Sequence, residues 1–292
     1  MLHIVTSFGI AGIDSFPVRA EVNVSFGMPA FEIVGLPDAT VRESRERVKA
    51  AILNSGYKMP EERITVNLAP ADRKKEGPSF DLPIAVGLLA CKRDIPGAAL
   101  AGVAFVGELS LNGAIQPVRG VLPMVLAARA LGLSAIVLPQ ANAMEVRCVD
   151  GIAILPAGSL EQVVAHLSGK RPIEPLVPVP YNQLMAQRTP SADFMHVKGQ
   201  KAAKRALEIA AAGGHNVLLI GPPGSGKTLL ARCIPSILPD MSFEEALEVT
   251  RIHSVSGSVP EAGLITERPF RSPHHTASQA SLVGGGSNAM PG

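Results

Sequence analysis

Residues 216–228 read NVLLIGPPGSGKT. The stretch begins with a short apolar run over 216–220, which is typical of a buried parallel strand. It continues into GPPGSGKT (221–228), which matches G-x-x-x-x-G-K-[ST] at every fixed position, and a helix is expected directly after it over 228–234. A strand, a glycine-rich turn and a helix in this order predict a phosphate-binding loop in an α/β fold, and a chance glycine-rich turn is the disfavoured alternative.

Each type of residue in this loop has a role in holding a nucleotide. Glycine lets successive backbone N–H groups turn inward around a phosphate, where a Cβ atom would block the turn. Lys227 supplies a cation for the β- and γ-phosphates, and the Thr228 hydroxyl can hold Mg²⁺. We therefore expect ATP and Mg²⁺ as cofactors, bound by Gly221, Pro222, Pro223, Gly224, Ser225, Gly226, Lys227 and Thr228.

Hydrolysis of ATP needs more than this cradle. It requires a carboxylate at a strand end for Mg²⁺ and a group that orients the attacking water. No run of four apolar residues ending in Asp or Glu follows Thr228, and GLITE (263–267) is only a poor match. Because 64 residues after Thr228 are too few to complete a multi-stranded sheet, we expect a fragment with the phosphate-binding half of an ATPase module. The residues that catalyse hydrolysis stay unassigned.

Proline divides the chain. Residues 170–190, KRPIEPLVPVPYNQLMAQRTP, hold five prolines, which exclude a helix and favour an extended, semi-rigid linker. We expect a first domain over 1–169, a linker over 170–192 and part of a second domain over 193–292.

Strands and helices alternate in the first domain, which predicts an α/β or α+β fold. We expect strands at 4–5, 18–24, 63–68, 103–111, 114–118 and 135–138, and helices at 38–56, 81–91, 121–131 and 159–167. Asn112-Gly113 predicts a two-residue hairpin turn, because both central positions of such a turn need positive φ. In the second domain, helices are expected at 199–212 and at 243–251, the latter opened by a capping box from Ser242 to Glu245.

Composition excludes several classes of protein. Hydrophobic residues make up 47% and charged residues 18%, which excludes a disordered chain. Aromatic residues make up only 4%, with no Trp, and the net charge is +2, so neither a stacking platform nor a strongly basic surface for nucleic acid is expected. Three widely spaced cysteines suit a reduced cytoplasmic protein, and no apolar run is long enough to span a membrane.

Several stretches together resemble the magnesium-chelatase-type AAA+ ATPases, and among them the ComM/YifB group. These stretches are VKGQ (197–200), AKRALEIAAAGGHN (203–216), GPPGSGKT (221–228), SFEEALEVTRIHSV (242–255), RPFRSPHHT (268–276) and LVGGGSN (282–288). The resemblance implies a P-loop AAA+ module, a homo-hexameric ring and a helicase that promotes DNA branch migration during natural transformation, with single-stranded or branched DNA as partner. It also places Val197 and Gly199 near the adenine base, and a Walker B strand after residue 292.

The first domain resembles the Lon proteolytic domain, in the fold of ribosomal-protein-S5-domain-2-like proteins. In EGPSFD (76–81), Ser79 lies where Lon-type proteases carry their nucleophile, and the stretch 107–122 resembles the one that ends in their catalytic Lys. That last position is Leu122 here, and leucine cannot accept the proton of a serine. We therefore expect that Ser79 caps the helix beginning near Asp81 and that the domain is not proteolytic.

For the remaining polar residues, the sequence gives weaker indications of a functional role. His274 and His275 are adjacent on an extended segment and should point in opposite directions, so a role facing DNA or a neighbouring subunit is favoured over a metal site. Solvated surface positions are expected for Arg268, Arg271, Lys198, Lys201, Lys204 and Arg205. The sequence leaves open whether the ring acts on DNA or remodels a protein partner, and it disfavours an ATP-dependent protease.

Overall fold

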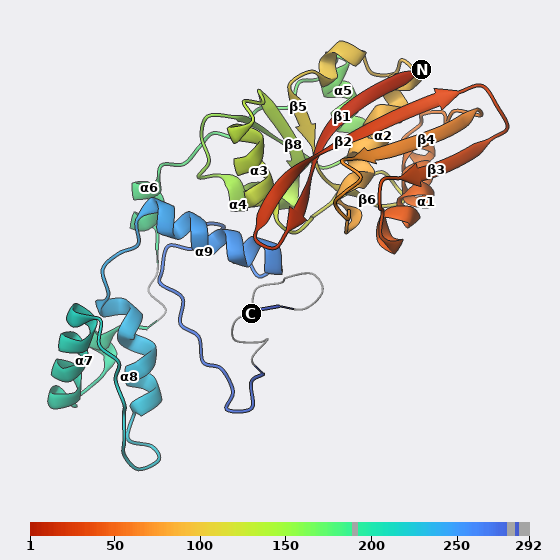
Figure 1. Ribbon diagram of the computed structural model, residues 1–292. Coiled ribbons are helices and arrows are strands. Elements are labelled where there is room, and N and C mark those ends of the chain that lie inside the picture. The colour runs from red at the N-terminus through yellow and green to blue at the C-terminus, as the bar shows by residue number, and fades with distance from the viewer. Residues whose placement is uncertain (189–191, 279–283, 286–292) are drawn as a thin grey trace.

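A seven-stranded mixed sheet forms the centre of the first part of the chain (Figure 1). The computed structural model describes residues 1–188, 192–278 and 284–285. The strand order is β3-β4-β2-β1-β5-β8-β9, and β6 with β7 makes a separate two-stranded ribbon. The strands are β1 (Leu2–Ala11), β2 (Asp14–Ser25), β3 (Ala30–Val34), β4 (Arg63–Ala69), β5 (Val103–Phe105), β6 (Glu108–Leu109), β7 (Ile115–Gln116), β8 (Ala135–Pro139) and β9 (Ala153–Ala157).

The longest pairing in the sheet is the antiparallel hairpin of β1 and β2. Its register runs from Leu2 opposite Asn23 to Ala11 opposite Asp14, and Gly12 turns the chain at φ +62°. Along β2, buried apolar side chains such as Val18 alternate with more exposed ones, because successive side chains of a strand point to opposite faces of the sheet. Both strands are longer than the sequence predicts.

Helices cover the sheet in two layers. On one face lie α1 (Ala39–Asn54), α2 (Asp81–Cys91) and α5 (Leu160–Leu167), whose buried side chains share one core. On the other face lie α3 (Val121–Ala130) and α4 (Ala143–Val146), which share a second core with the later helix α9 (Phe243–Ser256). The helices predicted in the first domain are therefore confirmed, and α4, β3 and β9 are additional elements.

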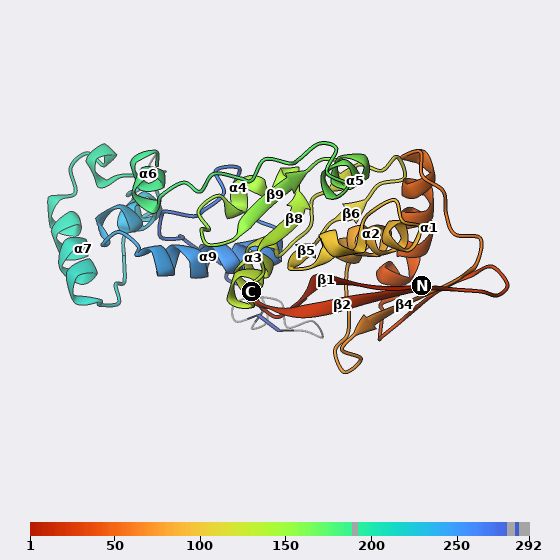
Figure 2. The same ribbon diagram turned by 90° about the horizontal axis from the view of Figure 1, so that it is seen from above.

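The second part of the chain contains two groups of helices. The first group, α7 (Lys201–Gly213) and α8 (Lys227–Cys233), has a small core of its own. Both helices lie away from the sheet in Figure 1, and Figure 2 shows the same for α7. The second is α9, which lies along α3 and contacts it. The predicted capping box opens α9, since Ser242 and Glu245 exchange side-chain and backbone hydrogen bonds, but the helix continues five residues beyond the predicted end.

The proline-rich segment departs from the prediction, because it contains a helix, α6 (Tyr181–Ala186). Pro180 is the residue before that helix and none of its own positions is a proline, so its hydrogen bonds are not blocked. The extended part also lies on the first domain, where the N–H of Leu176 donates to the carbonyl of Ile154 at 2.8 Å.

The predicted hairpin at Asn112-Gly113 is wrong in detail. The single strand predicted over 103–111 is divided into two: β5 joins the large sheet, while β6 pairs with β7. Of the two turn residues only Gly113 has positive φ, at +83°. The Asn112 side chain instead closes the turn, because its Oδ1 accepts from the Ser110 hydroxyl at 2.7 Å and from the Ala114 N–H at 3.1 Å.

The strand predicted over 216–220 does not form. Leu218 and Ile220 are 82% and 86% exposed, and no strand lies beside this segment among the residues that the structure describes. A strand is held by hydrogen bonds to its neighbour, so an apolar run without a neighbouring strand stays extended and unpaired. Among the helices of residues 1–188 and 192–278, none has both the length and the apolar character needed to cross a bilayer.

Candidate functional site

The phosphate-loop sequence forms an open turn in front of α8. Gly224 and Gly226 have φ angles of +80° and +84°, in the left-handed region that favours glycine. A Cβ atom built on either glycine would meet nothing within 4 Å. Glycine is therefore favoured at positions 224 and 226 by the backbone conformation, whereas a Cβ atom on Gly221 would lie 3.2 Å from the Ser225 hydroxyl oxygen.

Lys227 lies inside the turn. Its ammonium donates to the carbonyls of Gly221 and Pro222 at 2.8 and 2.7 Å, and to the Ser225 hydroxyl at 3.3 Å. In the described part of the chain no carboxylate pairs with this ammonium. Since its partners are neutral oxygens, its positive charge is left for an anion such as a phosphate. Thr228, next in sequence, is exposed at the start of α8.

The turn is connected to the start of α7 by a contact that the sequence does not predict. The amide nitrogen of Gln200 donates to the Ser225 carbonyl at 3.3 Å, and Gln200 itself has a positive φ of +52°. Gly199 also has a positive φ, of +70°, and Val197 is buried in the small core together with Leu230 of α8. The structure thus brings the segment 197–200 next to the phosphate loop.

The weak candidate for a magnesium-binding strand, 263–267, forms no strand. The N–H of Ile265 donates to the Thr250 hydroxyl at 2.9 Å, and Leu264 is buried against the first domain. Gly263 lies so close to Met144 that an added Cβ atom would come within 2.0 Å of the Met144 carbonyl. The segment therefore packs between α4 and α9.

Ser79 is not a helix cap, so that prediction is wrong. It lies in a 3₁₀ turn, Pro78–Phe80, and α2 begins after Phe80 with no side-chain cap. The N–H of Leu82 instead donates to the Gly107 carbonyl at 3.0 Å, so a neighbouring loop satisfies the start of the helix. Ser79 is 6% exposed and lines a cavity, and its hydroxyl makes no hydrogen bond with the described residues.

A buried ion pair holds the turn that carries Ser79. Asp81 is fully buried and accepts from the Arg47 guanidinium at 2.7 and 3.0 Å, and from the Leu109 N–H at 3.2 Å. Burial raises the pKa of the Asp81 carboxyl, and the hydrogen bonds from Arg47 oppose this rise. Asp81 therefore has a structural role, because its carboxylate pairs with Arg47 of α1.

Leu122 belongs to the hydrophobic core. It lies in the first turn of α3, fully buried, and its N–H donates to the Glu145 carboxylate at 3.0 Å. Glu145 also accepts from the Asn142 amide at 3.2 Å and from the Ser254 hydroxyl of α9. Burial raises the pKa of this carboxyl. No lysine or histidine of the described chain lines the cavity at Ser79.

We expect no peptidase activity from the first domain. A serine nucleophile needs an adjacent base, and the position of the Lon lysine holds a buried leucine. Incubation with casein, followed by release of acid-soluble peptides, should give the same background for the wild type and for Ser79→Ala. Cleavage that is lost in Ser79→Ala alone would overturn this assignment.

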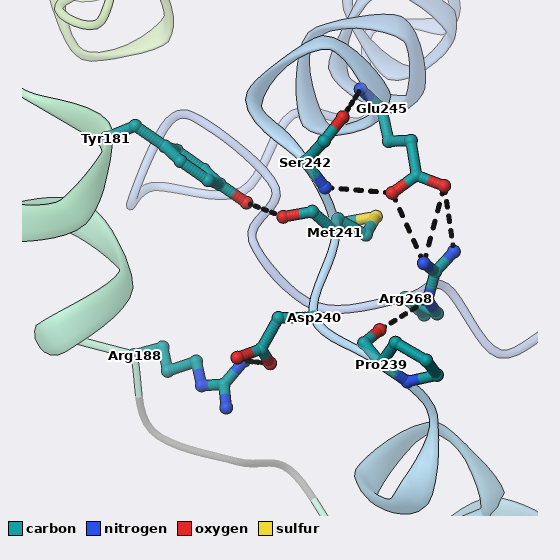
Figure 3. Close-up of polar contacts among 8 residues, drawn as sticks. All are labelled: Tyr181, Arg188, Pro239, Asp240, Met241, Ser242, Glu245 and Arg268. Carbon is teal, nitrogen blue, oxygen red and sulfur yellow. Dashed lines mark hydrogen bonds and ion pairs between the residues drawn. The ribbon is translucent and has the colours of Figure 1, made fainter.

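Arg268 is part of a polar cluster around the segment that leads into α9 (Figure 3). It donates to the Pro239 carbonyl at 2.8 Å and pairs with Glu245 at 3.2 Å. On the other side, the Tyr181 hydroxyl donates to the Met241 carbonyl at 2.7 Å and Arg188 pairs with Asp240. The solvated position expected for Arg268 is therefore wrong, because this cluster fixes residues 239–242.

Two other surface predictions need correction. Lys204 does not face solvent alone, since its ammonium donates to the carbonyls of Phe194, at 3.0 Å, and of Val197. His274 and His275 do not point apart: their ring centroids are 4.1 Å from each other. Arg271 lies 3.3 Å from the imidazole of His253.

Comparison with known proteins gives two matching family models. The model described as subunit ChlI of Mg-chelatase matches residues 20–142, and the model described as magnesium chelatase, subunit ChlI, matches residues 193–292. The first half is also similar to Lon protease 2 of Bacillus subtilis, at 27% identity over 53% of this chain and 29% of that protein.

Whole-chain relatives are more similar. The protein YifB of Salmonella typhimurium is 46% identical over all of this chain and 56% of its own length. The competence protein ComM of Haemophilus influenzae is 42% identical over all of this chain and 57% of its own length. The chain therefore spans somewhat more than half the length of these relatives. With both models and these identities, the chain belongs to the Mg-chelatase ChlI-type AAA family and is a homologue of YifB and ComM.

Proposed function

We propose that this chain supplies the nucleotide-binding loop of an ATP-driven DNA motor. The observation that carries the proposal is the loop at 221–228, with two left-handed glycines and an ammonium that no described carboxylate neutralises. Backbone N–H groups of the loop would hold the phosphates of ATP, Lys227 would neutralise their charge, and the Thr228 hydroxyl would hold Mg²⁺. Residues 197–200 would lie beside the bound nucleotide, because Gln200 contacts the loop.

The motor itself is proposed for the full-length protein. The similarity to a competence protein favours DNA as the substrate, acted on by a homo-hexameric helicase during uptake of DNA. Salt-sensitive binding of the full-length protein to forked DNA, in the presence of an ATP analogue, would support this in an electrophoretic shift assay. A ring that binds no DNA under these conditions would favour the alternative, a motor that remodels a protein partner.

Nucleotide binding is testable on the chain as it stands. ATP with Mg²⁺ at 100 times its dissociation constant should stabilise the fold by about 2.7 kcal/mol, which raises Tm by several degrees. Lys227→Ala should abolish this rise, because it removes the cation from the loop. The matched control is Lys58→Ala, an exposed lysine of the first domain. An equal ATP response in the wild type and Lys227→Ala would refute the assignment.

A further inference from the structure

Gln200 is the residue before α7, and its backbone has a conformation that glutamine rarely adopts. Its φ and ψ are +52° and +36°, in the left-handed region, and Gly199 before it has a φ of +70°. A residue with a Cβ atom is strained in this region. Strained positions persist only where surrounding contacts hold them, and they often lie at binding sites. Contacts of Gln200 with its surroundings must therefore offset this strain.

The side chain of Gln200 does not start the helix that follows it. At the N-cap position of α7 a side-chain oxygen usually accepts from a backbone N–H of the first turn, but Gln200 makes no such bond. Its amide nitrogen instead donates to the Ser225 carbonyl of the phosphate loop at 3.3 Å. Because a carbonyl oxygen can only accept, the nitrogen of the amide is the atom that faces the loop. The strained residue thus serves the loop and not its own helix.

This bond ties the glycine-rich turn to α7. In the described part of the chain, every other hydrogen bond of residues 221–226 is made inside the turn, with Lys227 or with Leu230 of α8. A Cβ atom on Gly224 or Gly226 would meet nothing within 4 Å, so packing does not hold the turn at these glycines either. The Gln200 amide is therefore the polar contact that fixes the turn relative to α7.

The segment that carries Gln200 is itself firmly held. The Lys204 ammonium donates to the carbonyls of Phe194, at 3.0 Å, and of Val197. The backbone N–H of Lys204 donates to the Gln200 carbonyl at 2.9 Å. Phe194 and Val197 are both buried in the small core that α7 and α8 share. Gln200 therefore reaches the turn from a fixed base, which a side chain needs if it is to set the position of another group.

Holding the Ser225 carbonyl also decides where the next backbone N–H points. The Ser225–Gly226 peptide bond is trans, and the C=O and N–H groups of a planar trans peptide point in opposite directions. With the carbonyl turned to Gln200, the Gly226 N–H faces the other side, where no described group accepts from it. Free N–H groups of a glycine-rich turn before a helix are the groups that bind phosphate oxygens.

We propose that Gln200 is a positioning residue for the phosphates of ATP: its amide holds the Ser225 carbonyl, so that the Gly226 N–H is free to donate to a phosphate oxygen. The inference rests on the nucleotide binding proposed above and adds to it a residue outside the motif. Because Gln200 acts on the phosphate side, its loss should weaken the binding of inorganic tripolyphosphate as much as that of ATP. A glutamine that contacted the base or the sugar would weaken ATP alone.

The test measures the dissociation constants of ATP and of tripolyphosphate, each with Mg²⁺, for residues 1–292 by isothermal titration calorimetry. Gln200→Met keeps the length of the side chain and removes the donor. It should raise both dissociation constants about tenfold, the size expected for one hydrogen bond. Gln200→Gly should do the same, although glycine relieves the strain of a positive φ. In ¹H–¹⁵N spectra, tripolyphosphate should move the Gly226 amide proton downfield in the wild type and much less in either variant.

Gln183→Met is the matched control, since Gln183 is an exposed glutamine of α6, and it should bind both ligands as the wild type does. Circular dichroism spectra show whether Gln200→Met is folded; if it is not, Gln200→Gly decides. Loss of binding in Lys227→Ala together with wild-type binding in Gln200→Gly would overturn the role of Gln200 and leave the nucleotide loop intact. A Gln200→Gly chain that loses ATP but keeps tripolyphosphate would also overturn it, and a wild type that binds neither ligand would overturn both proposals.

Discussion

Purified residues 1–292 are expected to bind ATP and to release phosphate no faster than background. The groups that hold the ground state, the loop and Lys227, are present. Beyond the loop, residues 263–267 pack against α4 and α9 instead of forming a strand that ends in a carboxylate. The missing groups act mainly in the transition state, where an arginine finger alone is worth about 10³–10⁵ in rate. Relative to the full-length protein, the rate of ATP hydrolysis should therefore fall far more than the affinity for ATP.

A malachite-green assay on the purified chain measures this directly. Lys227→Ala defines the background, and the full-length protein defines the active rate. Phosphate release at the full-length rate, abolished by Lys227→Ala, would show that a carboxylate within these residues acts in hydrolysis. Glu261 precedes the 263–267 segment and Glu267 ends it. The variants Glu261→Gln and Glu267→Gln would then show which of these two carboxylates supports hydrolysis.

Asp81→Ala is expected to destabilise the first domain by about 3 kcal/mol. Removing one partner of a buried ion pair costs roughly 3–5 kcal/mol, because the remaining charge is buried without compensation. The lower end applies here, since the Arg47 side chain is 19% exposed and can regain some water. The chain has no Trp, so circular dichroism is the suitable probe of urea unfolding. The urea concentration at the midpoint of unfolding should be lower than in the wild type, with an unchanged m value.

Two further variants test the cause of this loss. Glu32→Ala breaks an exposed pair with Arg63 and should cost about 0–1 kcal/mol. The double variant Arg47→Met/Asp81→Leu replaces both charges by apolar groups and should recover most of the stability lost in Asp81→Ala. If the double variant is no more stable than Asp81→Ala, the loss comes from packing and not from an unpaired charge.

Local signals in the sequence predict much of this fold. The capping residues Asp38, Ser159 and Ser242 each begin a helix, because a cap satisfies backbone groups within a few residues of itself. The left-handed glycines of the phosphate loop are local in the same sense.

The errors arise where distant segments decide the outcome. The run at 216–220 has the composition of a strand but no neighbour to pair with, and Ser79 is not a cap because Gly107 satisfies the helix instead. The contact between Gln200 and the phosphate loop joins residues 25 positions apart in the chain. No local pattern predicts such contacts, and the cavity beside Ser79 depends on the still more distant Val255.

The docking of α9 on α3 affects where a gene for this protein can be shortened. An expression boundary placed in the proline-rich segment would give a polypeptide without Met241, Ala246 and Leu264, which fill the second core. It would also remove Ser254, one of the donors to the buried Glu145 carboxylate. Such a polypeptide would expose apolar surface to solvent and tend to aggregate, so a deletion that keeps residues 241–265, joined by a flexible spacer, is the better design for isolating the first domain.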